Sequence, residues 1–140
     1  MILKSFISNQ SKADLHQVYQ LAKQVLVVDT SPLSIKLIAD GVKQLNHIYV
    51  GSASTVSEVE EGIERYHADI LFINCHLKGN VDGLQLAKVI KHDHDIPFYM
   101  MCAENDCESK KWSAELNPDG FIYLSQSPNH FKDQLRTALG

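Results

Sequence analysis

Short apolar runs alternate with longer stretches of helical periodicity along most of this sequence. The continuous apolar runs at residues 25–28 and 70–73 predict strands that are buried on both faces of a sheet. Residues 33–45 carry apolar side chains at helical spacing directly after a Ser-Pro pair, which is typical of the start of a helix. Thr55 and Glu58 form a Thr-x-x-Glu capping box, which predicts a second helix start.

The same alternation continues through the rest of the chain. Further strands are predicted at residues 48–50, closed by Gly51, at 97–102 and at 121–124. Further helices are predicted at residues 84–92, at 105–116 and from Ser127 and Pro128 onward. Successive strand–helix units favour a parallel sheet with helices on both faces, commonly in the order 2-1-3-4-5. We therefore predict an α/β fold, a flavodoxin-like, doubly wound five-stranded parallel sheet.

Residues 1–24 precede this pattern, and residues 25–140 contain it. Leu15, Val18, Tyr19 and Ala22 follow the i, i+3, i+4, i+7 spacing of an amphipathic helix. We therefore expect an extra N-terminal helix before the first strand. The default expectation is that this helix packs on its own domain. The alternatives are pairing with another copy and a linker role in a longer signalling protein.

Composition narrows the class of protein. A length of 140 residues with 44% hydrophobic residues fits one domain with a packed core. A net charge of −4 without a cluster of Lys or Arg argues against nucleic-acid binding. We expect neither a membrane span nor a secretory signal. Three cysteines, Cys75, Cys102 and Cys107, match no zinc-finger spacing, which indicates reduced thiols in a cytoplasmic protein.

The chemistry of such a fold is expected where the parallel strands end. Ligands bind beyond the carboxyl ends of the strands, near the point where the strand order reverses. The side chains expected at this edge are Asp29, Thr30, Asn74, Cys75, Cys102, Ala103, Leu124 and Ser125.

The segments that end at these positions resemble the receiver domain of bacterial response regulators, the CheY-like fold. VLVVDT resembles the first strand of that family and its acidic pair, and ILFINCHLKGNVDGLQLA resembles the third strand, phosphorylation loop and following helix. IPFYMMCA resembles the fourth strand, and DGFIYLSQ resembles the segment that ordinarily ends in Lys-Pro. The resemblance covers residues 25–139. It implies phosphoryl transfer from a histidine kinase to an aspartate, assisted by Mg²⁺.

The resemblance also implies that the phosphorylation pocket is degenerate. Asp29 keeps the first acid of the pair, but Thr30 replaces the second, and Asn74 stands at the position of the phosphorylated aspartate. Cys102 replaces the switch Thr or Ser, and Leu124 replaces the lysine. An amide cannot form an acyl phosphate, a thiol is a weak donor, and one carboxylate offers little charge to Mg²⁺. We expect weak or absent Mg²⁺ binding and no other cofactor.

The expected function is therefore that of a receiver-like signalling module, a non-enzymatic domain that acts through protein–protein contacts in the cytoplasm. The resemblance implies a contact face on the fourth helix, fifth strand and fifth helix of the family fold. The residues expected on this face are Trp112, Phe121, Tyr123 and Phe131, with Lys110 and Lys111 beside them. A partly buried position covering the sheet is an equal expectation for Trp112. The expected partners are a histidine kinase, a regulator or a second copy, and neither nucleic acid nor a membrane is expected.

Some alternatives keep a phosphate or a phosphate-bearing cofactor at this edge. A shifted register would make Asp69 or Asp82 the acceptor, although Asp69 starts the strand and Asp82 lies beyond the loop. The domain could also be phosphorylated by an atypical route, or be the input domain of a larger regulator. Flavin binding would fit the topology, but residues 30–34 have hydroxyls and lack the glycine of a flavodoxin phosphate loop.

A further alternative is metal or thiol chemistry. Cys75, His76 and Cys102 are expected at one sheet edge, and thiolates with an imidazole suit zinc. The opposing expectation is that Cys102 fills space in the core while Cys75 and His76 lie in a loop. His92 and His94 are two residues apart, so they do not share a helix face, and a solvated helix end is expected there.

Overall fold

A computed structural model describes residues 22–77, 82–103, 105–124 and 127–140 of the chain. The predicted N-terminal helix therefore lies outside the described residues, apart from Ala22 at its end. The first described strand begins at Gln24, one residue before the predicted start.

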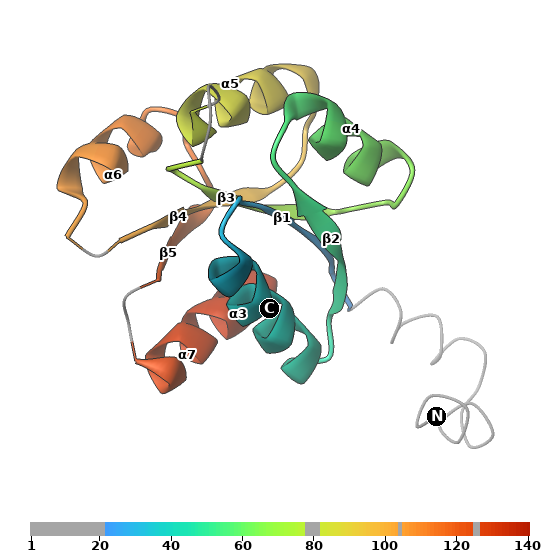
Figure 1. The fold of residues 1–140 in the computed structure, drawn as a ribbon, viewed down its shortest axis with the longest axis vertical. Helices are drawn as coiled ribbons and strands as arrows, with labels where there is room; N and C mark the ends of the chain where they lie inside the picture. The colour runs from blue at the N-terminus through green and yellow to red at the C-terminus, as the bar shows by residue number, and fades with distance from the viewer. Residues whose placement is uncertain (1–21, 78–81, 104, 125–126) are drawn as a thin grey trace.

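Strands and helices alternate through the described part of the chain (Figure 1). The strands are β1 (Gln24–Val28), β2 (Ile48–Ala53), β3 (Ile70–Asn74), β4 (Phe98–Cys102) and β5 (Gly120–Tyr123). The helices are α3 (Pro32–Gln44), α4 (Val56–Glu64), α5 (Gly83–Asp93), α6 (Cys107–Ala114) and α7 (Pro128–Leu139). All neighbouring strands pair in parallel, in the order β2-β1-β3-β4-β5, which confirms the predicted doubly wound topology.

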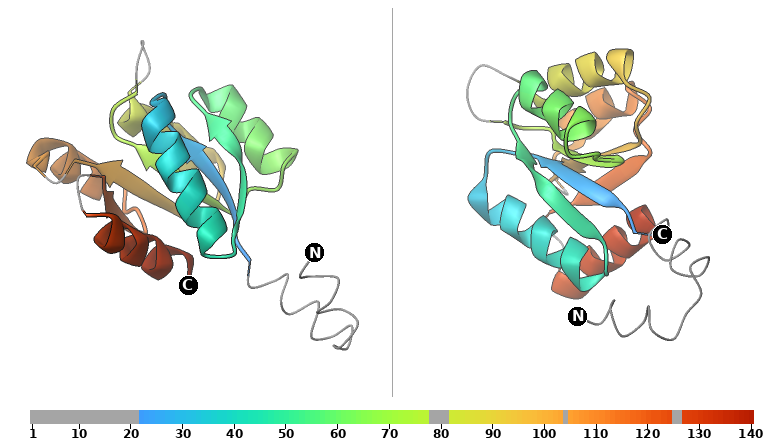
Figure 2. Two further views of the ribbon diagram at one scale, coloured as in Figure 1. Left: turned by 60° about the horizontal axis from the view of Figure 1, so that its bottom comes forward. Right: turned by 90° about the vertical axis from the view of Figure 1, so that its right-hand side faces the viewer.

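The helices form a layer on each face of the sheet. Helices α3 and α7 cover one face, and α4, α5 and α6 cover the other (Figures 1 and 2). The central strands alternate between the two layers: Leu26 and Leu71 belong to the core under α4 and α5, whereas Val27 and Phe72 belong to the core under α3 and α7. All four side chains are buried. Because β1 and β3 each face two cores, their sequences are continuous apolar runs.

Helix starts follow the predicted capping signals. The hydroxyl of Thr55 accepts a hydrogen bond from the Glu58 amide at 3.1 Å, and Glu58 Oε1 accepts one from the Ser54 amide at 3.1 Å. Helix α7 begins directly after Ser127, whose hydroxyl accepts from the His130 amide at 3.4 Å. The hydroxyls of Thr55 and Ser127 thus satisfy amides in the first turn of each helix, which have no intrahelical partner, and Glu58 binds the amide that precedes the N-cap of α4.

Two predictions need correction. Gly51 does not close the second strand, because β2 continues to Ala53 through an irregularity that pairs Val25 with Tyr49 and Leu26 with Gly51. The φ of +148° at Gly51 is one that glycine adopts readily, so the strand bulges there instead of ending. Phe131, predicted on an exposed contact face, is 4% exposed and packs in the core under α7.

Candidate functional site

Asp29 organises the turn that follows β1. The residue is 3% exposed, and its amide donates a hydrogen bond to the Ala53 carbonyl at 3.0 Å. Its Oδ1 accepts hydrogen bonds from the amides of Thr30 at 2.7 Å and Ser31 at 3.0 Å. Ser31 is also the N-cap of α3, so one buried carboxylate fixes both the end of the strand and the start of the helix.

Asn74 ends β3 beside Asp29. Its Nδ2 donates a hydrogen bond to Asp29 Oδ2 at 3.0 Å, and its Oδ1 accepts one from the His76 amide at 3.0 Å. A carboxylate only accepts hydrogen bonds, so the amide nitrogen must face Asp29 and the amide oxygen must face the backbone N–H. Both ends of the Asn74 side chain therefore have matched partners.

The start of α5 presses against the backbone of Asn74. A Cβ on Gly83 would lie 1.9 Å from the Asn74 carbonyl oxygen, so only glycine fits this approach. Asp82 precedes it as the N-cap, and its Oδ1 accepts a hydrogen bond from the Leu84 amide at 2.9 Å. The Asp-Gly pair therefore places a helix N-terminus directly against the end of β3.

Cys75 and Cys102 meet on the α6 side of the sheet. The Cys75 amide donates to the Met101 carbonyl at 3.0 Å, and the two Sγ atoms lie 2.7 Å apart, as free cysteines. Cys75 Sγ also lies 3.3 Å from the Oγ of Ser113 in α6. Cys75 and Cys102 are each 1% exposed and Ser113 is fully buried, so this cluster is shielded from water.

Hydrogen bonding separates the acidities of the two thiols. The bond from Cys102 holds the pKa of the Cys75 thiol at about 7, and the Ser113 hydroxyl acts in the same direction against burial. The same bond raises the pKa of Cys102, and burial raises it further. Cys75 is therefore the group that becomes a thiolate, and Cys102 is the group that keeps its proton.

His76 joins the loop after β3 to the loop after β4. Its Nε2 lies 2.5 Å from Asp106 Oδ2, and this hydrogen bond is the main cause of the raised pKa of His76. The imidazole is largely exposed and the carboxylate is mostly covered. Sequence reasoning did not find this pair, because residues 76 and 106 are brought together only by the adjacency of β3 and β4.

The remaining predicted pocket residues, Leu124 and Thr30, add no charged group to the Asp29–Asn74 pair, which Thr30 contacts through its backbone amide. Leu124 donates its amide to the Cys102 carbonyl at 3.1 Å, while its side chain packs against the core under α3 and α7. Thr30 is half-buried. The structure thus joins Asp29 to Asn74 and Cys102 to Cys75, on different sides of the sheet edge.

The zinc alternative gains no support from this arrangement. Cys75 and Cys102 are in contact, but His76 is bonded to Asp106. Within the described ranges, no group of three or more His, Cys, Asp or Glu side chains could hold a metal ion.

The predicted contact face is partly built from β5. Phe121 and Tyr123 are half-buried, and Lys110 Nζ lies 5.2 Å from the ring centroid of Tyr123 and 5.8 Å from that of Phe121. Gln134 of α7 accepts a hydrogen bond from the Tyr123 amide at 2.9 Å and donates one to its carbonyl at 3.2 Å. Trp112 belongs to α6, but its side chain lies outside the described part of the structure.

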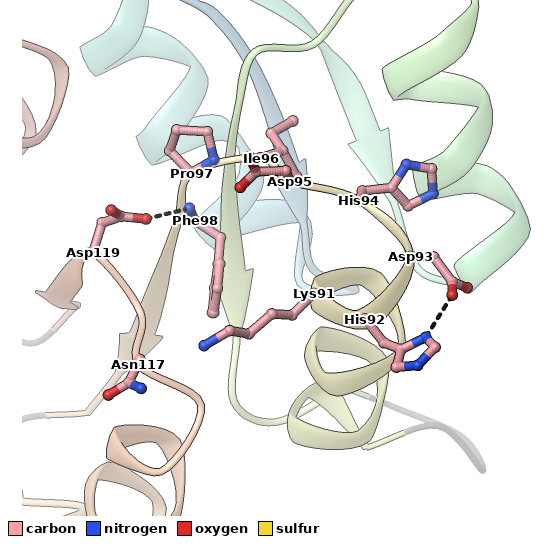
Figure 3. A pocket seen from close by; sticks show the side chains of 10 residues that line it. All are labelled: Lys91, His92, Asp93, His94, Asp95, Ile96, Pro97, Phe98, Asn117 and Asp119. Atoms are coloured by element: carbon pink, nitrogen blue, oxygen red, sulfur yellow. Dashed lines mark hydrogen bonds and ion pairs between the residues drawn. The ribbon is translucent and has the colours of Figure 1, made fainter.

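A separate pocket of about 510 Å³ lies at the opposite end of β4 (Figure 3). It is lined by residues 91–98, Asn117 and Asp119. His92 bonds Asp93 at 2.8 Å, and His94 bonds Glu60 of α4 at 3.1 Å. The two histidines line this pocket but bond separate carboxylates. His92 is exposed, as a solvated helix end predicts, whereas His94 is only 17% exposed, because it packs beside Glu60 of α4.

The fold and the site together define a receiver-type α/β domain. Its strand order is that of the doubly wound sheet, and an acid after β1 meets the polar side chain that ends β3. The chain belongs to the response regulator receiver domain family, whose match covers residues 25–136. In the described residues, no helix is long and apolar enough to cross a membrane.

Known relatives agree with this assignment. The heme response regulator HssR of Staphylococcus aureus (strain Newman) is 28% identical over 99 residues, which make up 71% of this chain and 43% of that protein. The chain therefore spans less than half the length of this curated relative.

Solved structures support the fold. NtrX from Brucella abortus superposes with a TM-score of 0.73 at 22% identity, over 84% of this chain and 27% of that one. The BeF₃-activated N-terminal receiver domain of RstA from Klebsiella pneumoniae superposes with a TM-score of 0.70 at 20% identity, over 84% of this chain and 98% of that one.

Proposed function

We propose that this receiver domain signals without an aspartyl phosphate, through contacts with protein partners in the cytoplasm. The observation that carries the proposal is that Asn74 ends β3 beside Asp29, since the sequence resemblance places Asn74 at the position of the family's phosphorylated aspartate. A carboxylate can attack a phosphoryl group and form an acyl phosphate, whereas an amide has no ionised oxygen with which to do so. The Asn74 amide is also held between Asp29 and the His76 amide.

The surroundings of Asn74 do not fit Mg²⁺. This ion prefers near-octahedral oxygen coordination with carboxylate charge. Among the residues that the structure describes, Asp29 is the carboxylate that contacts Asn74, and its two oxygens already accept hydrogen bonds from Thr30, Ser31 and Asn74. A bound cation would have to replace these hydrogen bonds. We therefore assign no role to Mg²⁺ in this domain.

We infer that the domain acts through protein contacts at the edge formed by β5. Lys110 lies over the rings of Phe121 and Tyr123, which gives this edge of the sheet a surface of aromatic and cationic groups. Tyr and Phe are enriched at protein interfaces whereas Lys is depleted there, so it is the two rings that favour a contact face. We propose a histidine kinase, another regulator or a second copy of this chain as the partner.

The test is exposure to a phosphodonor. The purified chain is incubated with acetyl phosphate and Mg²⁺, and separately with beryllofluoride and Mg²⁺. Intact-mass and amide NMR spectra are then recorded. We expect no added phosphate and unchanged resonances for Asp29 and Asn74. A phosphate that is released by hydroxylamine would overturn the proposal, and peptide mapping would then distinguish Asp69 and Asp82 as acceptors.

A further inference from the structure

Cys75 and Cys102 are neighbours because of the register between β3 and β4. Asn74 pairs with Met101, and the Cys75 amide continues this ladder by donating to the Met101 carbonyl at 3.0 Å. One step further along, Cys75 stands beside Cys102. Neighbouring strands lie roughly 4.8 Å apart, which falls within the Cα–Cα range of roughly 4.4–6.8 Å that a disulfide requires.

The side chains of the pair also point toward each other. Their Sγ atoms lie 2.7 Å apart as free thiols, and the two cysteines are buried on the α6 side of the sheet. Cys75 leaves the strand on the face opposite to Asn74, so the thiol pair is separate from the Asp29–Asn74 contact. At 2.7 Å, the two sulfurs lie within about 1 Å of the S–S bond length of a disulfide.

We propose that Cys75 and Cys102 form a redox pair, which a small peroxide converts into an intramolecular disulfide. The proposal goes beyond the proposed function, because it holds whether or not the domain accepts a phosphate. It assigns this edge of the sheet a modification that involves neither Asp29 nor Asn74.

The two thiols have different parts in this reaction. The Cys75 thiolate attacks one oxygen of hydrogen peroxide, the O–O bond breaks, and a sulfenic acid and hydroxide result. Cys102 then attacks the Cys75 sulfur. The S–S bond forms as the S–O bond breaks, and the departing hydroxide takes the thiol proton as water. The proton that the Cys75 thiol lost on ionisation neutralises the hydroxide of the first step. Overall, two thiols lose two protons and two electrons, and one peroxide becomes two water molecules.

Disulfide formation changes how α6 is held. In the reduced state, Ser113 of α6 lies 3.3 Å from Cys75 Sγ, within a fully buried cluster. A disulfide sulfur is a poorer hydrogen-bond acceptor than a thiolate, so oxidation weakens this buried contact. Helix α6 also carries Lys110, which lies over Tyr123. Oxidation at the end of β3 is therefore expected to reach the face where we propose that partners bind.

The test counts thiols before and after oxidation. The reduced chain is treated with hydrogen peroxide, quenched, denatured and alkylated, and its intact mass and peptide map are recorded. Of the three cysteines, we expect all to be labelled before treatment and one afterwards, with a Cys75–Cys102 cross-linked peptide. Three labels after oxidation, or a cross-link to Cys107, would refute the proposal.

Matched variants identify the pair. Cys107→Ser should still form the cross-link, whereas Cys75→Ser and Cys102→Ser should not. The peptide map of the unsubstituted chain decides the pairing on its own, even if a variant folds poorly.

Hydrogen exchange tests the effect on α6. Faster exchange of its amides after oxidation is expected, and unchanged exchange would refute the coupling to this helix. The phosphodonor experiment has a different readout, so failure of either proposal is recognised separately.

Discussion

The side-chain amide of Asn74 donates a 3.0 Å hydrogen bond to the buried carboxylate of Asp29. This contact joins the ends of β1 and β3, which are adjacent strands in the sheet. The Asn74 amide donates to the buried carboxylate of Asp29, whereas an aspartate at position 74 would repel it. The Asp29–Asn74 pair is therefore a stabilising feature of the domain in addition to its place in the proposed function.

Replacing Asn74 with Asp should destabilise the domain in the absence of Mg²⁺. The substitution places a second carboxylate against Asp29 and removes a donor, so we expect unfolding free energy to fall by roughly 1–3 kcal/mol at pH 7. Such repulsion raises the pKa of one carboxyl, so the deficit should shrink as pH falls toward 4. Urea unfolding measures both effects.

Gln85→Glu is the control for this experiment, because it adds a carboxylate at an exposed position of the neighbouring helix α5. We expect it to change stability by less than about 0.5 kcal/mol. Equal stability of Asn74→Asp and the unsubstituted chain would contradict the role given to the Asn74–Asp29 bond.

Replacing Gly83 with Ala should be costly. Its Cβ would lie 1.9 Å from the Asn74 carbonyl oxygen, and a backbone atom can yield only by moving the end of β3. We expect a loss of roughly 1–3 kcal/mol in denaturant unfolding. Gly62→Ala is the matched comparison, since its Cβ would meet the flexible side chain of Leu26 at 2.7 Å. Helix propensity offsets part of that cost, so a larger loss at Gly62 would contradict the packing described here.

The Cys75 thiol should make the stability of the reduced protein depend on pH. In the folded protein the pKa of the Cys75 thiol is about 7, whereas the pKa of a thiol in an unfolded chain is about 8.5. The folded state therefore binds fewer protons than the unfolded state between these values. This contribution is complete above pH 8.5 and is lost as pH falls through 7.

Urea unfolding in the presence of a reductant checks this dependence. Between pH 7 and 8.5 the reduced chain should gain stability that Cys75→Ser does not gain. His76 and Asp106 lie near the pair, so both proteins should be compared in the background of Asp106→Asn as well. Parallel curves for the two proteins would show that Cys75 does not titrate in this range.

The His76–Asp106 pair should act in the opposite direction. The hydrogen bond to Asp106 raises the pKa of His76, so its contribution is complete below pH 6.5 and is lost as pH rises through the folded pKa. Because the imidazole is 70% exposed, screening should keep the effect below about 1 kcal/mol. NMR titration of the unsubstituted chain should show the raised pKa of His76. Urea unfolding of His76→Gln should show that this pH-dependent contribution to stability is lost. An unshifted His76 titration would contradict the contact.

The fold could be predicted from sequence because its signals are local and repeated. The apolar runs of β1 and β3 and the capping pair Thr55–Glu58 each specify one element, and the chain alternates them regularly. The extension of β2 through Gly51 was missed, because glycine commonly marks a turn and the bulge depends on pairing with β1. Local pattern identifies elements better than their exact ends.

The site was harder to predict because it depends on contacts between strands. Asn74 and Asp29 were both expected at the same edge, and the structure brings them into contact. The role of that contact stays a prediction. Cys75 lies directly after β3, as expected, and it is buried against Cys102 and Ser113. Both cysteines were expected at one sheet edge, but their direct contact depends on the register between β3 and β4, which a local sequence pattern does not contain.

The side-chain amide of Gln134 makes two hydrogen bonds to the backbone of Tyr123, and these limit how another molecule can bind to β5. An outer strand normally offers free main-chain N–H and C=O groups, to which a foreign strand can add. At Tyr123 both groups are already bonded to the Gln134 amide. Extension of the sheet by a partner's backbone is therefore blocked at this position. A partner at this edge must recognise ring faces and charges, so its specificity would follow from its own side chains and not from a β-strand conformation.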